Sequence, residues 1–271
     1  MLRLTRAWNI LIIVVAQYAA AWFLLDPSVV ATAKLFLLSL STGLIAAAGY
    51  IINDYFDVKI DLINRPDRVV VGTKMSRRSA IFLHVVLSSA GVLAGWAVNW
   101  KVAGLNFSSA LLLWLYSARL KRGPFFGNLS IALLTFASVA VIYLAFPSQE
   151  PLIWFYAGFA FAMTMVREAV KDMEDVKGDK TFGCETLPII WGLYKSKIYT
   201  AAWIVILLIF ILIVHLYLYP LPVWYFLALV FLPLGIFSFR LVRADTVNEF
   251  NALSLLSKII LMLGIVSMAA V

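Results

Sequence analysis

Long apolar stretches alternate with short polar connections along nearly the whole chain. Several of these stretches reach about 18 residues, which is enough for a helix to cross ~30 Å of hydrocarbon. The pattern therefore predicts an all-α, polytopic membrane protein. We expect nine membrane spans, near residues 8–25, 29–54, 78–99, 103–118, 127–146, 151–173, 198–217, 222–241 and 253–270.

No low-complexity linker and no separate polar segment interrupts this alternation. We therefore predict a single transmembrane domain over residues 1–271, with polar motif loops near 53–77, 116–127 and 167–197. The first apolar stretch is too long for the core of a signal peptide and lacks a convincing cleavage site, so we interpret it as a retained span.

Composition supports the membrane interpretation and limits the chemistry. Hydrophobic residues make up 63% of the chain and charged residues 13%, which is far from the soluble average. The single cysteine, Cys184, excludes an intrachain disulfide and a cysteine-based zinc cluster. The histidines, His84 and His215, have no partner at ligand spacing, so we do not expect a transition-metal site.

The net charge of +8 comes from basic residues that are concentrated in alternate connections between the predicted spans. Basic residues gather before the first span and in the connections that follow spans 2, 4, 6 and 8, whereas the opposite connections carry little beyond Lys34 and Lys101. Basic loops remain in the cytoplasm. We therefore expect an integral protein of the cell (plasma) membrane with a cytoplasmic N-terminus and cytoplasmic motif loops, and we expect no nucleic-acid partner.

Acidic residues form two clusters, four of the fourteen in residues 54–67 and six in 168–185. If the second span continues as a helix, Asn53, Asp57 and Asp61 share one face, because they are spaced i, i+4 and i+8. The second cluster repeats this spacing, at Glu168, Asp172, Asp175 and Asp179. Like charges at such spacings repel, so a positive partner must compensate them.

Carboxylate and amide oxygens suit a hard cation, and Mg²⁺ in particular combines a few carboxylates with substrate phosphates. A solvated helix end is the plain alternative for any one of these carboxylates. Basic residues interleaved with both clusters favour a polyanion bridged by Mg²⁺ over a simple cation site. The mixture indicates a site for Mg²⁺ and a diphosphate.

Three segments in this order resemble the UbiA-type intramembrane prenyltransferase superfamily, and together with the nine-span plan the resemblance extends over most of the chain. They read NDYFDVKID followed by NRPDR, YSARLKRGPFFGN, and REAVKDMEDVKGDKTFGCETLPIIWG. The resemblance implies about nine transmembrane helices around a central cavity. It also implies Mg²⁺-dependent transfer of an isoprenyl group from an allylic diphosphate to a lipophilic acceptor within the membrane.

The resemblance also implies residue roles. The metal ligands are Asn53, Asp57, Asp61, Asp175 and Asp179. Catalysis is assigned to these four aspartates together with Lys121, and diphosphate binding to Asn53, Arg68, Lys121, Tyr116, Lys171 and Arg167. Candidates for a supporting role are Asp54, Glu168 and Asp172.

The donor expected from the resemblance is geranylgeranyl diphosphate. The motif details look most like the branch that makes digeranylgeranylglyceryl phosphate, with geranylgeranylglyceryl phosphate as acceptor. That branch typically continues into a P-I-P-S-G turn, where this chain has VVVGT at Val69–Thr73, so an aromatic acceptor remains an alternative. A secondary transporter is the alternative from another class, although transporters usually place ionisable groups near the bilayer midplane.

Overall fold

The computed structural model describes residues 5–64, 66, 69–148 and 151–271. These residues form α-helices with short connections, and the described part contains no strand beyond an isolated bridge between Val71 and Met75. The chain divides into two compact units, and one helix is divided between them. The first unit comprises residues 1–122 and 137–148, and the second comprises 123–136 and 149–271. The prediction of an all-α fold is confirmed.

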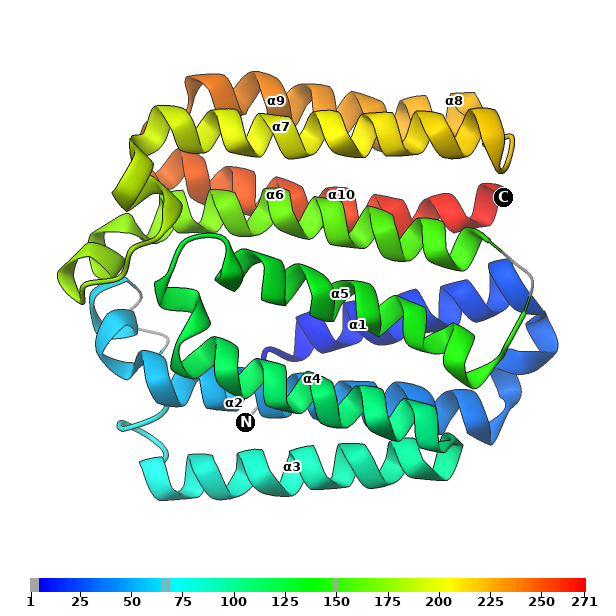
Figure 1. The fold of residues 1–271 in the computed structure, drawn as a ribbon, viewed down its shortest axis with the longest axis horizontal. Helices are drawn as coiled ribbons and strands as arrows, with labels where there is room; N and C mark the ends of the chain where they lie inside the picture. The colour runs from blue at the N-terminus through cyan, green and yellow to red at the C-terminus, as the bar shows by residue number, and fades with distance from the viewer. Residues whose placement is uncertain (1–4, 65, 67–68, 149–150) are drawn as a thin grey trace. The chain divides into compact units, whose positions relative to one another are not determined.

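In the first unit, the long helix α2 packs against α1, α3 and α4 (Figure 1). The unit also contains the second half of α5 (Phe126–Ala145). Its other elements are α1 (Ala7–Ala20), the π-helical η1 (Ala21–Leu25), the 3-10 helix η2 (Pro27–Ala31), α2 (Ala33–Asn64), α3 (Arg77–Val98), α4 (Trp100–Ala118) and the 3-10 helix η4 (Leu120–Arg122).

Helix α2 begins and ends later than the predicted span 29–54. At its start, the Thr32 hydroxyl accepts a hydrogen bond from the backbone N–H of Leu35 at 3.2 Å, which satisfies one of the free donors of the first turn. At its other end, the helix continues to Asn64, because the apolar pattern marks where hydrocarbon ends and not where backbone hydrogen bonding ends. The first part of the predicted loop 53–77 is therefore helical.

In the second unit, α6 packs against α7 and α10 (Figure 1). The unit begins with the first half of α5. Its other elements are α6 (Leu152–Thr181), α7 (Leu187–Tyr217), α8 (Val223–Phe226), the π-helical η5 (Leu227–Phe231), α9 (Leu232–Arg243), α10 (Val247–Ser267) and the 3-10 helix η6 (Met268–Ala270).

Most of the predicted loop 167–197 is also helical, since α6 extends to Thr181 and α7 begins at Leu187 instead of near 198. Gly192 interrupts α7 with a φ of 78°, in the left-handed region that glycine adopts most easily. The sequence pattern missed this first part of α7 because the segment is short and is followed by two lysines.

Seven helical segments in the described residues are long and apolar enough to cross a membrane. They are Ala7–Leu25, Ala33–Ile63, Arg77–Val98, Phe126–Ala145, Leu187–Tyr217, Val223–Arg243 and Val247–Ala270. The other two long helices are α4 and α6, of 19 and 30 residues, and both contain charged side chains. Helices α8, η5 and α9 are continuous and count as one segment, Val223–Arg243. The described residues therefore contain nine long helices, the same number as the predicted spans.

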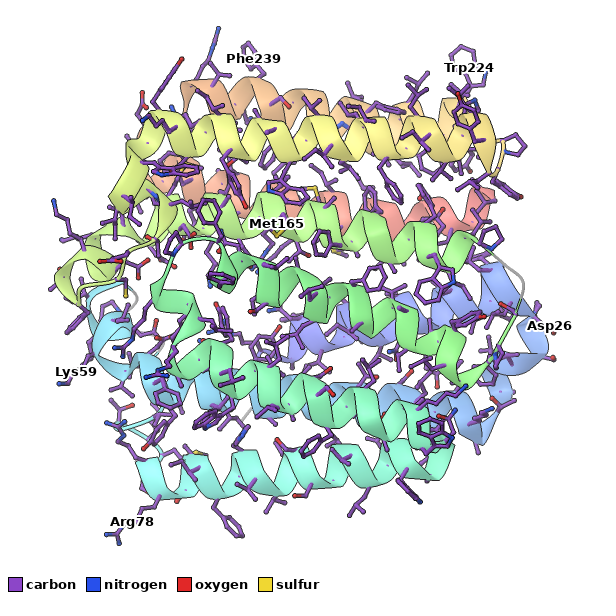
Figure 2. All side chains as sticks on the ribbon, in the orientation of Figure 1. Asp26, Lys59, Arg78, Met165, Trp224 and Phe239 are labelled. Atoms are coloured by element: carbon purple, nitrogen blue, oxygen red, sulfur yellow. The ribbon has the colours of Figure 1, made fainter. Side chains whose placement is uncertain are left out.

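Large apolar side chains point outward from the helices, as expected in a lipid environment. Trp224 and Phe239 project away from α8 and α9, with exposed fractions of 84% and 58% (Figure 2). Met165, in contrast, is buried on α6. Monomeric soluble proteins rarely expose large apolar patches, so the chain is an integral, multi-pass membrane protein.

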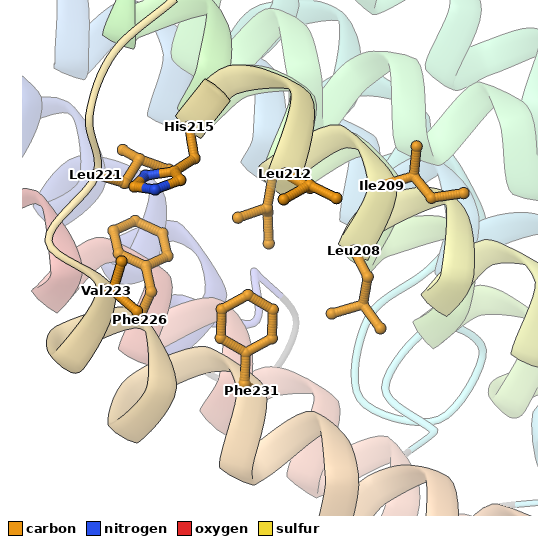
Figure 3. A pocket seen from close by; sticks show the side chains of 9 residues that line it. Leu208, Ile209, Leu212, His215, Leu221, Val223, Phe226 and Phe231 are labelled. Atoms are coloured by element: carbon orange, nitrogen blue, oxygen red, sulfur yellow. The ribbon is translucent and has the colours of Figure 1, made fainter. Parts of the chain in front are cut away.

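An apolar hollow of about 470 Å³ lies in the second unit between the C-terminal part of α7 and η5 (Figure 3). Its lining includes Leu212, Phe226, Phe231 and His215. The Nδ1 atom of His215 is buried and has no hydrogen-bond partner among the described residues. The hollow lies near the C-terminal end of α7. The second acidic cluster precedes the other end of this helix, which begins at Leu187. The hollow is therefore separate from that cluster.

Small residues allow α3 to approach its neighbours closely. A Cβ atom on Gly91 would lie 2.8 Å from the Ile45 side chain and 3.1 Å from the Ser41 carbonyl oxygen of α2. The carbonyl oxygen of Gly91 also accepts a hydrogen bond from Asn106 Nδ2 of α4 at 3.1 Å. Such close approach is a common basis of helix association in membranes.

We expect Gly91→Ala to lower the free energy of unfolding by about 1–3 kcal/mol, because the added methyl group forces α3 away from α2. Gly104→Ala is the matched control, since nothing lies within 4 Å of a Cβ atom there. It should leave stability unchanged or raise it by up to ~1 kcal/mol. Unfolding of the purified protein in mixed micelles measures both values, and equal effects of the two substitutions would contradict this packing.

Candidate active site

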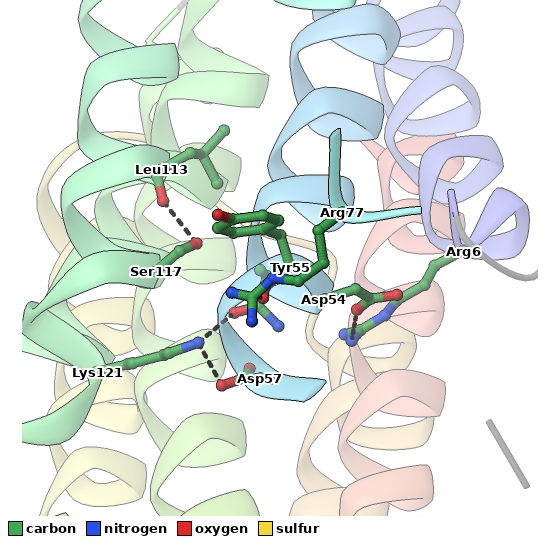
Figure 4. A network of polar contacts seen from close by, with 9 residues as sticks. Arg6, Asp54, Tyr55, Asp57, Arg77, Leu113, Ser117 and Lys121 are labelled. Carbon is green, nitrogen blue, oxygen red and sulfur yellow. Dashed lines mark hydrogen bonds and ion pairs between the residues drawn. The ribbon is translucent and has the colours of Figure 1, made fainter. Parts of the chain in front are cut away.

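The motif of the first acidic cluster lies on the last turns of α2, where helical periodicity places Asn53, Asp57 and Asp61 on one face. Lys121 reaches this face from η4. Its Nζ atom donates hydrogen bonds to Asp57 Oδ1 at 2.5 Å and to Asn53 Oδ1 at 3.3 Å (Figure 4). These three motif residues and Lys121 are all half-buried. The structure therefore brings together three of the residues that the sequence predicted for one site.

Lys121 owes its position to close packing between α2 and α4. Gly49 lies one turn before Asn53, and a Cβ atom on it would come within 2.7 Å of the Leu113 side chain of α4. Helix α4 then ends at Ala118, and η4 turns the chain so that Lys121 faces α2. The glycine contact thus sets the approach of the two helices near the site.

Asp54 points to a different partner from the motif residues, as its position about 100° around the helix from Asn53 requires. Its Oδ1 atom accepts a hydrogen bond from Arg6 Nη2 at 3.1 Å. The Arg6 guanidinium also lies 5.1 Å from the ring centroid of Tyr50, one turn earlier on α2. This supports a role for Asp54 in packing the helix. This contact was not predicted, because the sequence indicates Arg6 only as one of the basic residues before the first span.

Five of the six acidic residues of the second cluster lie on the last turns of α6. Asp172 Oδ2 accepts a hydrogen bond from Asn128 Nδ2 of α5 at 3.0 Å. The buried Glu168 carboxylate forms an ion pair with the adjacent Arg167. Asp175 and Asp179 follow on the same helix and are half-buried. The predicted spacing is therefore helical throughout, and two members of the cluster have side-chain partners in the second unit.

A fifth acidic residue of this helix, Glu174, was not predicted as part of the site. It is buried, and its Oε1 atom accepts a hydrogen bond from Asn251 Nδ2 of α10 at 2.9 Å. No pattern in the sequence links the two residues, which are 77 positions apart.

The remaining candidates occupy the same ends of these helices. Tyr116 is half-buried on α4, five residues before Lys121, and Lys171 is half-buried beside Asp172 on α6. Arg68, a predicted diphosphate ligand, lies outside the described residues.

The oxygen atoms of the first cluster fit a hard cation. In the described residues, no group of three or more His, Cys, Asp or Glu side chains is arranged to hold a metal ion. The Lys121 ammonium instead contacts Asn53 Oδ1 and Asp57 Oδ1, so a positive charge already lies against the two oxygens. Amide and carboxylate oxygens are also the ligands that Mg²⁺ prefers.

Comparison with known proteins shows which family the chain belongs to. The model of the UbiA prenyltransferase family matches residues 11–259. The digeranylgeranylglyceryl phosphate synthase of Thermococcus sibiricus is 39% identical over 150 residues, which are 55% of this chain and 53% of that protein. The synthase of the same name from Methanothermobacter thermautotrophicus is 40% identical over 161 residues, 59% of this chain and 56% of its own. The matched stretch thus spans little more than half the length of these relatives.

The fold has solved counterparts as well. A UbiA homologue from Archaeoglobus fulgidus bound to DMAPP and Mg²⁺ has a TM-score of 0.75 to this chain. The superposition covers 100% of this chain and 99% of the homologue at 17% identity, so it shows the fold. The family model covers far more than half of the sequence, and the chain therefore belongs to the UbiA prenyltransferase family.

Proposed function

We propose that the protein transfers an isoprenyl group from an allylic diphosphate to a lipophilic acceptor in a Mg²⁺-dependent reaction. The observation that carries this proposal is the position of Lys121 on Asn53 and Asp57, at the polar end of a membrane helix. The proposed donor is geranylgeranyl diphosphate and the proposed acceptor is geranylgeranylglyceryl phosphate. Family membership supports the reaction class, and the names of the relatives support the acceptor.

Each acidic cluster has a defined part in this proposal. Asn53, Asp57 and Asp61 on α2, and Asp175 and Asp179 on α6, are the residues that would hold Mg²⁺. When bound, Mg²⁺ neutralises the diphosphate oxygens as a Lewis acid. Arg68, Arg167, Lys171 and Tyr116 are further proposed contacts of the diphosphate.

Lys121 stabilises the departing diphosphate. As the bond between the allylic C1 atom and the diphosphate oxygen breaks, the electron pair moves to the diphosphate, and its growing negative charge attracts the ammonium group. To donate to a phosphate oxygen, Lys121 has to turn away from the Asp57 carboxylate. The acceptor hydroxyl oxygen then bonds to C1 and releases its proton.

The topology proposed from the basic residues places both clusters and the N-terminus at the cytoplasmic face of the cell membrane. A diphosphate head at that face leaves the isoprenoid tail to extend among the apolar helices. This arrangement suits a lipid enzyme better than a transporter, whose ionisable groups usually lie near the bilayer midplane.

We expect Lys121→Met to lower kcat/KM by about 100-fold, as the loss of one charged donor to a developing anion commonly does. Lys101→Met is the matched control, because Lys101 lies in the first turn of α4, the helix that precedes η4, with its Nζ atom 5.8 Å from the ring centroid of Trp100. Steady-state assays of diphosphate release would measure both variants. Full activity of Lys121→Met would show that Lys121 does not contact the departing group.

A second assay identifies the acceptor. The purified protein receives radiolabelled geranylgeranyl diphosphate, Mg²⁺ and either geranylgeranylglyceryl phosphate or an aromatic quinone precursor. We expect prenylated product with the glyceryl phosphate, and we expect Asp57→Ala and Asp175→Ala to abolish it. Product with the aromatic compound alone would reassign the acceptor, and no diphosphate release with either would refute the proposed reaction.

A further inference from the structure

Helices α6 and α10 of the second unit pack against each other along their length (Figure 1). Side-chain hydrogen bonds join them near both ends. At one end, Asn251 Nδ2 donates to Glu174 Oε1 at 2.9 Å. At the other end, the hydroxyl groups of Tyr156 and Ser267 lie 3.2 Å apart. Both contacts join the same two helices, but only the first lies beside the second acidic cluster.

Packing alone does not explain a carboxylate at position 174. Glu174 is 8% exposed on a long membrane helix, and Asp175 follows it directly. Burying a carboxylate is unfavourable, and an apolar side chain of similar size commonly packs at least as well. A further negative charge also repels the neighbouring acidic residues. A position that serves only the contact between α6 and α10 would not require this side chain.

Glu174 can control the direction of the residues that follow it. Adjacent residues of a helix point about 100° apart, so a side chain held at position 174 fixes the rotation of the last turns of α6. Asp175 and Asp179, one turn apart, then project in a defined direction. The hydrogen bond from Asn251 is therefore placed to orient the acidic motif without contacting a metal ion or substrate.

The position of Asn251 is itself fixed. Helix α10 begins with a capping box, in which the Thr246 hydroxyl accepts from the Glu249 N–H and the Glu249 carboxylate accepts from the Thr246 N–H. The preceding residue, Asp245, forms an ion pair with Lys197 of α7 at 2.9 Å. Asn251 follows in the next turn. The Asn251 amide that contacts Glu174 therefore lies near the capped N-terminus of α10, which an ion pair joins to α7.

We propose that Asn251 is a positioning residue for the second acidic motif and acts through its hydrogen bond to Glu174. The inference rests on the proposed function, because it takes Asp175 and Asp179 to bind Mg²⁺ with a diphosphate. It adds to that function two residues outside the metal motifs, in helices α6 and α10. Loss of such supporting contacts typically weakens metal binding by about 10–100-fold.

The test uses the full-length protein in detergent, with Mg²⁺ and inorganic diphosphate as the probe. The readout is the thermal unfolding midpoint as a function of Mg²⁺ concentration, which is independent of turnover. We expect Asn251→Ala to raise the Mg²⁺ concentration needed for half-maximal stabilisation by about 10-fold. Ser267→Ala, which breaks the contact at the other end of the same two helices, should leave that concentration unchanged.

Exchange of the pair separates positioning from stability. Asn251→Asp places two carboxylates together and should weaken Mg²⁺ binding at least as much as Asn251→Ala. Adding Glu174→Gln to Asn251→Asp restores a donor and an acceptor, so the double variant should recover a near-normal Mg²⁺ requirement. If Asn251→Ala does not fold, the comparison between Asn251→Asp and this double variant decides the question.

Equal Mg²⁺ requirements in wild type, Asn251→Ala and Asn251→Asp would overturn the inference, as would a double variant no better than Asn251→Asp. In both cases the proposed function survives if the wild type is stabilised by Mg²⁺ and diphosphate. A wild-type protein that is not stabilised by them would instead overturn the binding of Mg²⁺ with a diphosphate, and the positioning role with it.

Discussion

Carboxylates at the ends of membrane helices need partners, and the candidate site depends on how these partners are supplied. An unpaired charge in a poorly hydrated environment is unfavourable by several kcal/mol. On α2 and α6, acidic side chains are held by a cation or an amide from the same unit, in the pairs Asp54–Arg6, Asp57–Lys121, Glu168–Arg167, Asp172–Asn128 and Glu174–Asn251. Close helix packing, as at Gly49 against Leu113, brings such partners within reach.

The cationic and amide partners of these carboxylates differ in whether they can move to a substrate. The Lys121 ammonium ends a flexible side chain and contacts two oxygens that suit Mg²⁺. It can therefore move to a phosphate when another cation takes its place. Asn251 is neutral and stands near a capped helix start, so it can only hold its carboxylate in place. We therefore propose that Lys121 takes part in the reaction, whereas Asn251 orients the second acidic motif.

The spans and the shared helical faces could be predicted from the sequence because both follow from local periodicity. Helix ends were less predictable. Helix α2 continues ten residues beyond the predicted end of its span, from residue 54 to Asn64, since charged residues stop the apolar pattern without stopping the helix. The contacts of Arg6 and Asn251 join residues 48 and 77 positions apart. No local pattern encodes such pairs, so they required the structure.

In the proposed reaction, Lys121 exchanges its carboxylate partner for the diphosphate. An experimental structure with Mg²⁺ and an unreactive thio-analogue of geranylgeranyl diphosphate tests it most directly. We expect Asp57 to bind the metal ion through a carboxylate oxygen, with Lys121 Nζ at hydrogen-bond distance from a phosphate oxygen. A structure in which Lys121 remains on Asp57, while the diphosphate binds elsewhere, would contradict it.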